Sequence, residues 1–205
     1  MLKIWGRLNS INVQKVVLCA QELGLAYDRI DAGMSFGIVN TPEYRARNPN
    51  GLVPTIDDDG FVLWESNAIV RYLCATHGQD GVYPRDLRRR AEIEKWMDWQ
   101  QSALNAPTGT LFWGLVRSPG SRRPDDMEDA RGKAEAAMAI LDRLLADQGW
   151  ISGAAVGMAD FAIGPFVHRW LHLPISRPPL TALERYYGRL MSLASARSVL
   201  TLPLT

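Results

Sequence analysis

Residues 48–69 have the sequence NPNGLVPTIDDDGFVLWESNAI and carry the strongest local structural signals of the chain. Residues 52–56 favour extended backbone, the Asp-Gly pair at 59–60 is a turn signal, and residues 61–64 form a returning strand. A helical pattern of apolar residues then runs over 65–77 and ends at a glycine. This stretch therefore predicts a strand with a proline-marked bend, a tight hairpin and an amphipathic helix.

The polar groups of this stretch predict a cleft for a short peptide with a free amino-acid end. Val53 precedes Pro54 and is biased toward extended backbone, so its N–H and C=O are expected to pair with the main chain of a ligand. A cis Val53–Pro54 bond, an isomer that is cheap only before proline, would turn those groups out of the sheet. Ser66 at a helix N-terminus suits a carboxylate, and Glu65 suits an ammonium group.

The run NPNGLVP followed by LWESNAI resembles the glutathione-binding segment of the cytosolic glutathione S-transferase superfamily, and the resemblance covers nearly the whole chain. It implies that Val53 before cis Pro54, together with the neighbouring Leu52, lines the groove for the cysteinyl part of glutathione. It also implies that Glu65 and Ser66 bind the γ-glutamyl end. The alternative is a hairpin whose Glu-Ser pair only caps a helix, but the Val-Pro pair at this spacing favours binding.

The resemblance implies an α/β thioredoxin-like domain followed by an all-helical domain. The order of elements agrees with it, because residues 1–78 read as β-α-β, a variable connector and then β-β-α. Residues 79–86 contain Gly81 and Pro84, break every periodicity and are interpreted as a linker. Residues 87–205 have helical patterns throughout, with a break or kink expected at Pro107 and a final amphipathic helix over 180–190.

One helix of the second domain departs from the pattern of the superfamily. Relatives carry a Ser/Thr-x-x-Asp capping box before this helix, whereas Gly157 stands here in the place of the hydroxyl residue, three residues before Asp160. Because glycine is an acceptable N-cap, the helix is expected to form with the loss of one side-chain hydrogen bond. Asp160 is therefore predicted to have a structural role.

Composition predicts a folded soluble protein and excludes several partners. The 205 residues are 47% hydrophobic, and 23 basic against 22 acidic residues leave a net charge of +1, so no nucleic-acid or membrane partner is expected. Cys19 and Cys74 lie in apolar helical patterns without CxxC spacing, which indicates core residues in a reducing compartment and the cytoplasm. His168 and His172 are four residues apart but have no third ligand nearby, so no metal is expected.

If glutathione is the ligand, the protein must keep its thiol ionised near neutral pH, because the thiolate is the nucleophile. Neutral donors at the start of the first helix, helped by the helix dipole, would stabilise the sulfur anion. Ser10 and Asn12 are the catalytic candidates at that place, and both stay open, with Ser10 preferred because the superfamily places such a residue there. Ser10 could also serve only as an N-cap.

Two further parts of the site are less well marked. Relatives bind the glycyl carboxylate with a side chain at the position of Gly51 or Leu52, and neither residue can do so here. Asn40, Arg7 or a residue of the second domain is left as the replacement.

The helix after Pro107 is expected to supply a pocket for the electrophile. The candidate residues are Phe112, Trp113 and Arg117. They suit a flat apolar molecule with an acidic group, although an aromatic stripe on a helix is also typical of a hydrophobic core.

The function expected from these features is conjugation of the glutathione thiolate to small hydrophobic electrophiles, with reduction of hydroperoxides as a variant. The alternative is a transferase-like binding or assembly module without chemistry, which fold alone could not exclude. Val53, Glu65, Ser66 and Ser10 together favour the enzyme, and the missing CxxC disfavours thioredoxin-like redox work. A homodimer is implied by the resemblance alone.

Overall fold

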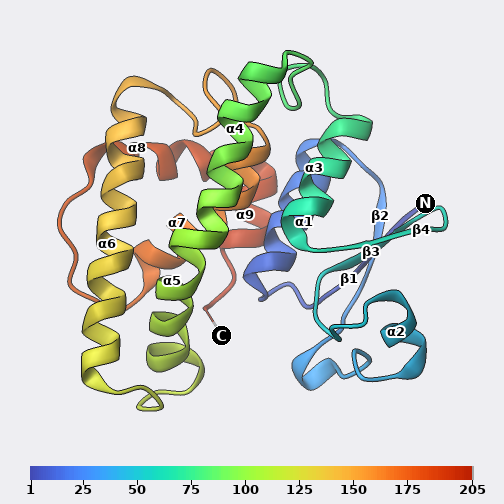
Figure 1. The fold of residues 1–205 in the computed structure, drawn as a ribbon, viewed down its shortest axis with the longest axis horizontal. Coiled ribbons are helices and arrows are strands. Elements are labelled where there is room, and N and C mark those ends of the chain that lie inside the picture. Colours follow the sequence, from blue (N-terminus) through green and yellow to red (C-terminus); the bar gives the residue numbers. More distant parts are fainter. Residues whose placement is uncertain (205) are drawn as a thin grey trace.

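The computed structural model describes residues 1–204, which form a small sheet-containing part beside a larger helical part (Figure 1). The predicted fold class, a thioredoxin-like region followed by a helical region, is confirmed. The sheet-containing part is made of β1 (Leu2–Trp5), α1 (Ile11–Glu22), β2 (Tyr27–Ile30), the 3-10 turn η1 (Met34–Phe36), α2 (Pro42–Arg47), β3 (Thr55–Asp58), β4 (Phe61–Trp64) and α3 (Ser66–His77).

The sheet has the strand order β2-β1-β3-β4, with β1 parallel to β2 and the other neighbours antiparallel. Side chains alternate between the two faces of a strand, so Ile4 and Trp5 of β1 point to opposite sides. Ile4 joins the main core with α1 and α3, whereas Trp5 packs with Ala32 and with Tyr44 of α2 in a second, smaller cluster. Helices therefore cover both faces of the sheet.

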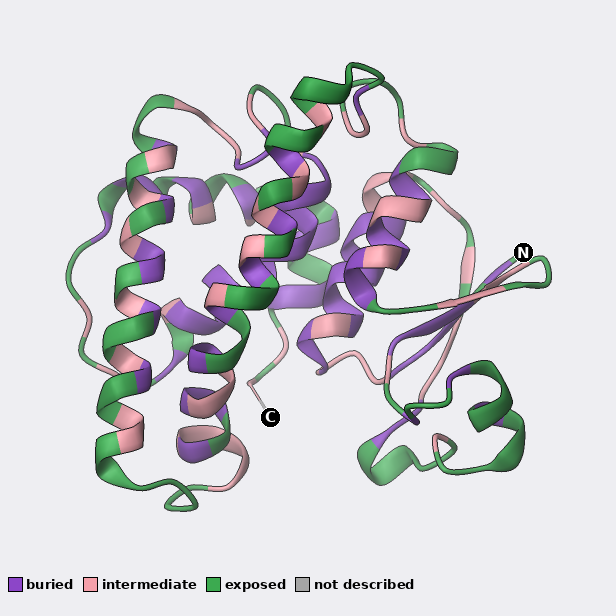
Figure 2. Cartoon of the chain, in the orientation of Figure 1, coloured by how far each residue is buried: buried purple, intermediate pink, exposed green. Residues whose placement is uncertain are grey.

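The helical part packs around α7, whose residues 158–170 are all buried (Figure 2). One apolar core runs from the sheet through α1 and α3 into α7, so the two parts share it. The elements of the helical part are α4 (Leu87–Trp99), the π turn η2 (Gln100–Leu104), α5 (Asn105–Phe112), the π turn η3 (Trp113–Arg117), α6 (Pro124–Asp147), α7 (Met158–His172), α8 (Thr181–Leu190) and α9 (Ala194–Leu200).

Three features of the fold differ from the sequence predictions. The connector expected to be irregular contains α2, because Thr41 caps the helix by accepting from the N–H of Tyr44 and Pro42 fits its first position. The break or kink expected at Pro107 is not a break, because the chain stays helical from α4 through η2 into α5; the helix changes to π geometry at η2, just before Pro107. The chain also forms α9 after the helix predicted to be final.

The capping hydrogen bond expected to be lost at Gly157 is supplied by another residue. The hydroxyl of Ser152 accepts from the backbone N–H of Ala159 at 3.2 Å, which is the bond that an N-cap serine would have made. The buried carboxylate of Asp160 accepts from the N–H groups of Ile151, Ser152 and Gly157 at 2.8 to 3.2 Å. Asp160 thus ties the preceding loop to α7 and has the structural role that was predicted.

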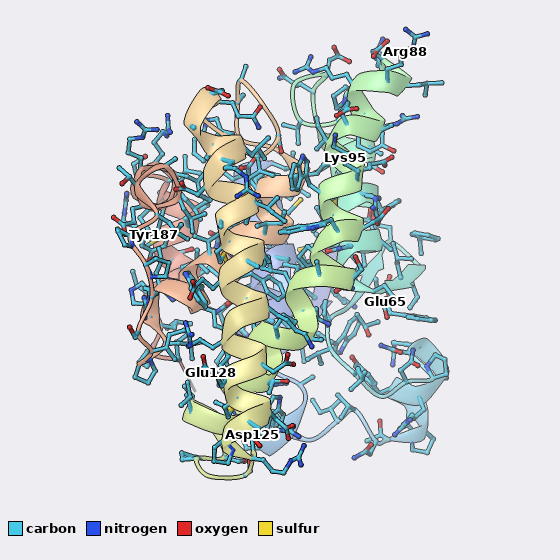
Figure 3. All side chains as sticks on the ribbon, turned by 60° about the vertical axis from the view of Figure 1, so that its left-hand side comes forward. Glu65, Arg88, Lys95, Asp125, Glu128 and Tyr187 are labelled. Carbon is cyan, nitrogen blue, oxygen red and sulfur yellow. The ribbon has the colours of Figure 1, made fainter. Side chains whose placement is uncertain are left out.

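The remaining candidates from the sequence lie outside any site. The arginine-rich run at 85–90 forms the exposed start of α4, from which Arg88 and Lys95 project outward (Figure 3). Cys19 and Cys74 are buried free thiols whose sulfur atoms lie 3.6 Å apart between α1 and α3. Within residues 1–204, no three His, Cys, Asp or Glu side chains gather as metal ligands, and no helix is both long and apolar enough to cross a membrane.

Candidate functional site

A cleft of about 510 Å³ lies between the sheet-containing part and the helices α5 and α7. A smaller recess of about 60 Å³ adjoins it and shares Asn12, Leu52 and Val53 with it. All the predicted site residues fall in these two spaces. The cleft is lined by Ser10, Asn12, Asn40, Leu52, Val53, Phe112, Trp113 and Arg117, and the recess by Pro54, Glu65 and Ser66.

The bend that borders both spaces is held from behind by two buried residues. The Val53–Pro54 peptide bond is cis, and neither backbone polar group of Val53 has a hydrogen-bond partner within residues 1–204. The carbonyl of the preceding Leu52 accepts from the Tyr44 hydroxyl at 2.7 Å and from the Asn48 amide at 2.9 Å. Sequence reasoning missed this support, because Tyr44 belongs to the helix α2 that it did not predict.

The recess is closed by the start of α3. Glu65 adopts φ of 73°, which is uncommon for a residue with a side chain and is a kind of strain that concentrates at binding sites. The Ser66 hydroxyl lies 3.4 Å from both the Asn12 amide oxygen and the ammonium group of Lys15. An anionic group in the recess would therefore meet a hydroxyl at a helix N-terminus with a cation behind it.

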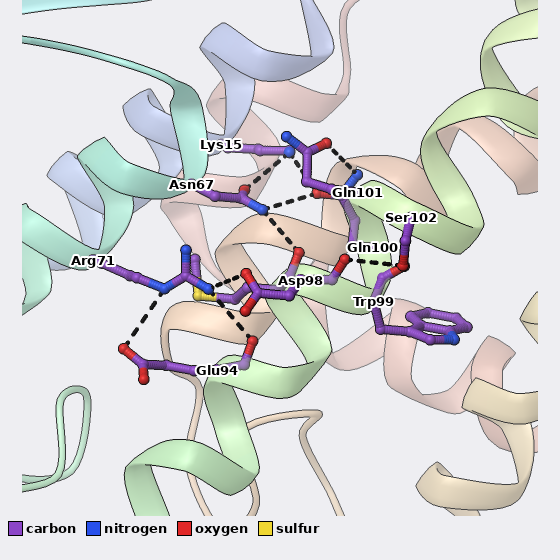
Figure 4. A network of polar contacts seen from close by, with 10 residues as sticks. Lys15, Asn67, Arg71, Glu94, Asp98, Trp99, Gln100, Gln101 and Ser102 are labelled. Carbon is purple, nitrogen blue, oxygen red and sulfur yellow. Dashed lines mark hydrogen bonds and ion pairs between the residues drawn. The ribbon is translucent and has the colours of Figure 1, made fainter. Parts of the chain in front are cut away.

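Lys15 is fully buried and was not recognised in the sequence (Figure 4). Its ammonium group donates to Gln100 at 2.7 Å and to Asn67 at 3.1 Å, and it lies 5.0 Å from the ring centre of Phe166. Burial lowers the pKa of Lys15 to about 7, against an opposing attraction to the Glu65 carboxylate and with a smaller repulsion from Arg169. This lysine links α1 and the start of α3 to η2 in the helical part.

The sulfur-contact candidates lie at the N-terminus of α1. Ser10 occupies the N-cap position of α1, as the alternative interpretation expected, but its hydroxyl makes no capping hydrogen bond. No acidic residue lies in the first turn to offset the positive end of the helix dipole. The amide oxygen of Asn12 accepts from the Ser66 hydroxyl at 3.4 Å, so the NH₂ group is the donor that Asn12 can offer to the cleft that it lines. Both residues can present a neutral donor to an anion.

The opposite wall of the cleft carries guanidinium groups beside aromatic rings. Arg117 lies over Phe112 at 5.1 Å and over Trp113 at 5.5 Å, and Arg169 lies over Phe112 at 4.0 Å, measured to the ring centres. Burial and then repulsion from Arg117 lower the pKa of Arg169 to about 9, and the same two causes lower the pKa of Arg7. No Asp or Glu of residues 1–204 lines this cleft.

The candidates for the glycyl carboxylate, Asn40 and Arg7, both line the cleft. Asn40 lines it, but its side-chain oxygen accepts from Arg45 at 2.9 Å. Arg7 lies beside Gly33 and Val53, since a Cβ at position 33 would come within 3.0 Å of its guanidinium and 3.5 Å of the Val53 side chain. Arg7 thus borders the side of the cleft where the bend lies.

Comparisons with known proteins agree with this geometry. Two family domains match the chain, the glutathione S-transferase N-terminal domain over residues 9–76 and the C-terminal domain over residues 124–189. Glutathione S-transferase GstB of Escherichia coli is 42% identical over 208 residues, covering 100% of both chains. A probable glutathione S-transferase GSTF2 of rice is 27% identical over 165 residues, covering 78% of this chain and 77% of its own length.

Solved structures show the same architecture. The theta class glutathione S-transferase of Xanthomonas axonopodis pv. citri with glutathione bound superposes with a TM-score of 0.95 at 42% identity, covering 100% of this chain and 99% of that one. A delta-class glutathione transferase of Nilaparvata lugens superposes with a TM-score of 0.86 at 25% identity, covering 98% of this chain and 97% of that one.

Proposed function

The chain belongs to the glutathione S-transferase family, and from that premise we propose that it joins the glutathione sulfur to small hydrophobic electrophiles and also reduces organic hydroperoxides. It is an enzyme, and glutathione is its co-substrate. One observation carries the proposal. A recess fit for an amino-acid end, two neutral donors at a helix N-terminus and an aromatic wall adjoin one another around one continuous space.

In the proposed complex, residues 1–78 hold glutathione and residues 87–205 supply the wall that faces its sulfur across the 79–86 linker. The free backbone groups of Val53 before Pro54 pair with the cysteinyl unit as an added strand, with Leu52 beside them. The helix N-terminus at Ser66 receives the α-carboxylate of the γ-glutamyl end, and Glu65 receives its ammonium group.

Arg7 and Asn40 are the proposed contacts of the glycyl carboxylate. Both line the cleft, and Arg7 lies on the side of Val53. A guanidinium can bind a carboxylate through two parallel hydrogen bonds, whereas the amide of Asn40 is partly engaged by Arg45. Arg7 is therefore the stronger of the two candidates.

Ser10 and Asn12 are the proposed contacts of the sulfur. Their donors, with the unopposed dipole of α1, favour the thiolate over the thiol and lower the pKa of the bound glutathione. The thiol proton leaves to solvent, and the sulfur then forms a bond to the electrophilic carbon as the leaving group departs with its electron pair. The Ser10 hydroxyl ranks first because no cap bond engages it, while Asn12 also faces Ser66.

Phe112, Trp113 and Arg117 form the proposed electrophile pocket. The two rings offer a flat apolar surface, and the guanidinium lies against both. The alternative of a non-catalytic binding or assembly module is not favoured, because the family and its relatives that match the whole chain are transferases. No observation on this structure supports that alternative.

Binding to immobilised glutathione, together with turnover of a chloronitroaromatic and of an organic hydroperoxide, tests the proposal. Substituting Ser66→Ala is expected to weaken glutathione binding about 10-fold, since a hydrogen bond to a charged group contributes roughly 1.5–3 kcal/mol and water replaces part of it. Titration calorimetry measures the change, and Ser121→Ala in an exposed loop is the matched control. If the wild-type protein neither binds immobilised glutathione nor turns over either substrate, the proposed transferase function is refuted.

The proposed assembly is a homodimer, and the proposed location is the cytoplasm. Three exposed apolar side chains lie on the bend and on the edge strand β4, where a second copy could cover them; they are Leu52, Phe61 and Trp64. The two free thiols suit a reducing compartment.

Sedimentation of the protein at micromolar concentration is expected to give twice the monomer mass of 22.9 kDa, and a single monomer species would contradict the proposed dimer.

A further inference from the structure

We propose that Arg169 binds an anionic group of the second substrate, so that the enzyme prefers planar electrophiles that carry a carboxylate. The inference rests on the proposed function and narrows its substrate class. Arg169 belongs to α7, near its C-terminal end, and was not singled out by any sequence pattern. It lines the cleft beside Phe112.

The first support is that Arg169 is a buried cation without a counter-charge. Only 8% of the residue is exposed, yet it lines the cleft. Within residues 1–204 its Nε atom has no hydrogen-bond partner, and no carboxylate forms an ion pair with it. Buried charges in proteins are otherwise paired, because an isolated charge loses its hydration without compensation. The missing partner of Arg169 is expected to arrive with the substrate.

The second support is the sign of the charge around the cleft. Arg7, Arg117 and Arg169 line it and no acidic residue of the described chain does; burial, and after it repulsion from Arg117, lowers the pKa of Arg7 and of Arg169. Arg7 borders the bend and suits glutathione itself. Arg169 is left facing the space that the electrophile would fill, where an anion would relieve the repulsion.

The third support is shape. The Arg169 guanidinium lies 4.0 Å from the centre of the Phe112 ring and Arg117 lies 5.1 Å from it, so two cations and aromatic rings lie together in this wall of the cleft. A planar ring stacked on the exposed aromatic surface of Trp113 could contact the Arg169 guanidinium through its carboxylate with two hydrogen bonds. The ring carbon that reacts would then face Ser10 and Asn12 across the cleft.

A matched pair of probes tests the inference, 4-chloro-3-nitrobenzoate and the neutral 4-chloro-3-nitrobenzamide. In both, the glutathione thiolate attacks the carbon that bears chlorine, a C–S bond forms, and the C–Cl bond breaks as chloride leaves with the electron pair. The carboxylate takes no part in this step. Comparing the ratio of the two kcat/KM values between variants therefore cancels the difference in intrinsic reactivity of the two rings.

In the variant Arg169→Met, the benzoate-to-benzamide ratio of kcat/KM is expected to fall about 10- to 100-fold, the range of one hydrogen-bonded charge pair, with the KM for glutathione unchanged. Arg169→Lys is expected to restore part of it. Arg143→Met removes an exposed arginine of α6 and controls for net charge. An unchanged ratio overturns the inference, as does a raised KM for glutathione with the ratio intact, which would assign Arg169 to the tripeptide.

Inhibition of the wild-type enzyme gives a readout that needs no variant. As competitors of a chloronitroaromatic, 3-nitrobenzoate is expected to bind about 10-fold or more tightly than 3-nitrobenzamide, and equal inhibition would overturn the inference. Failure here is distinguishable from failure of the proposed function. In the first case glutathione is retained and neutral electrophiles are turned over without preference for the anion. In the second, glutathione is not retained and neither probe reacts.

Discussion

In the double variant Ser10→Ala/Asn12→Ala, kcat for a chloronitroaromatic is expected to fall about 10²–10³-fold. Removing a hydrogen-bond donor to an anion in the active site reduces kcat by this factor in other enzymes. The pKa of the bound thiol should rise toward about 8.5, the value of a free thiol. Both side chains line the cleft at the N-terminus of α1, and no acidic residue in the first turn opposes the helix dipole. Only that dipole would then remain to favour the thiolate.

The single variants rank the two donors. Ser10→Ala is expected to shift the thiol pKa more than Asn12→Ala, because no capping hydrogen bond engages the Ser10 hydroxyl, whereas the Asn12 side chain also contacts Ser66. The ultraviolet absorbance of the thiolate, followed against pH in the binary complex, measures the shift, with Ser121→Ala as the control. If Ser10→Ala leaves this absorbance unchanged and Asn12→Ala removes it, the ranking is wrong and the amide is the main donor.

The fold class could be predicted because its strongest signals are local. The Val53–Pro54 pair, the turn before β4 and the start of α3 at Ser66 follow one another within 22 residues, and each depends on backbone preferences of its own residues. The helix α2 was missed although Thr41 and Pro42 give a standard start signal, since the whole segment was interpreted as a variable connector. The helix α9 is too short for a periodic pattern to indicate.

The polar groups that pack deepest against the cleft could not be predicted, because their role depends on distant elements. Lys15 stands among the apolar residues of α1, and its partners Asn67 and Gln100 are 52 and 85 residues away. Arg169 lies in a helix whose other residues read as core. A charged residue in a helical pattern is normally assigned to the solvent-exposed face of the helix. Only the tertiary structure shows that these two charged side chains are buried and which side chains surround them.

The free energy of unfolding of the wild type is expected to rise with pH above neutrality, and the variant Lys15→Met is expected to lack this rise. The pKa of Lys15 is about 7 in the fold against 10.5 for the ordinary side chain, because burial disfavours the charged form. Between these values the unfolded chain binds a proton that the folded chain does not, so the free energy of unfolding rises by about 1.4 kcal/mol per pH unit. The destabilisation is thus fully present below pH 7 and is relieved as pH approaches 10.5.

Urea unfolding at several pH values from neutrality to about 10 measures this effect. The wild-type free energy of unfolding minus that of Lys15→Met is expected to increase by at most about 4 kcal/mol over the window, whereas the same difference for Lys133→Met, a change at an exposed lysine paired with Asp129, stays flat. A flat difference for Lys15→Met would mean that the ammonium group keeps its charge in the fold. A rising difference would mean that the group behind Ser66 changes its charge near neutral pH, so the positive charge available to a carboxylate in the recess declines as pH rises.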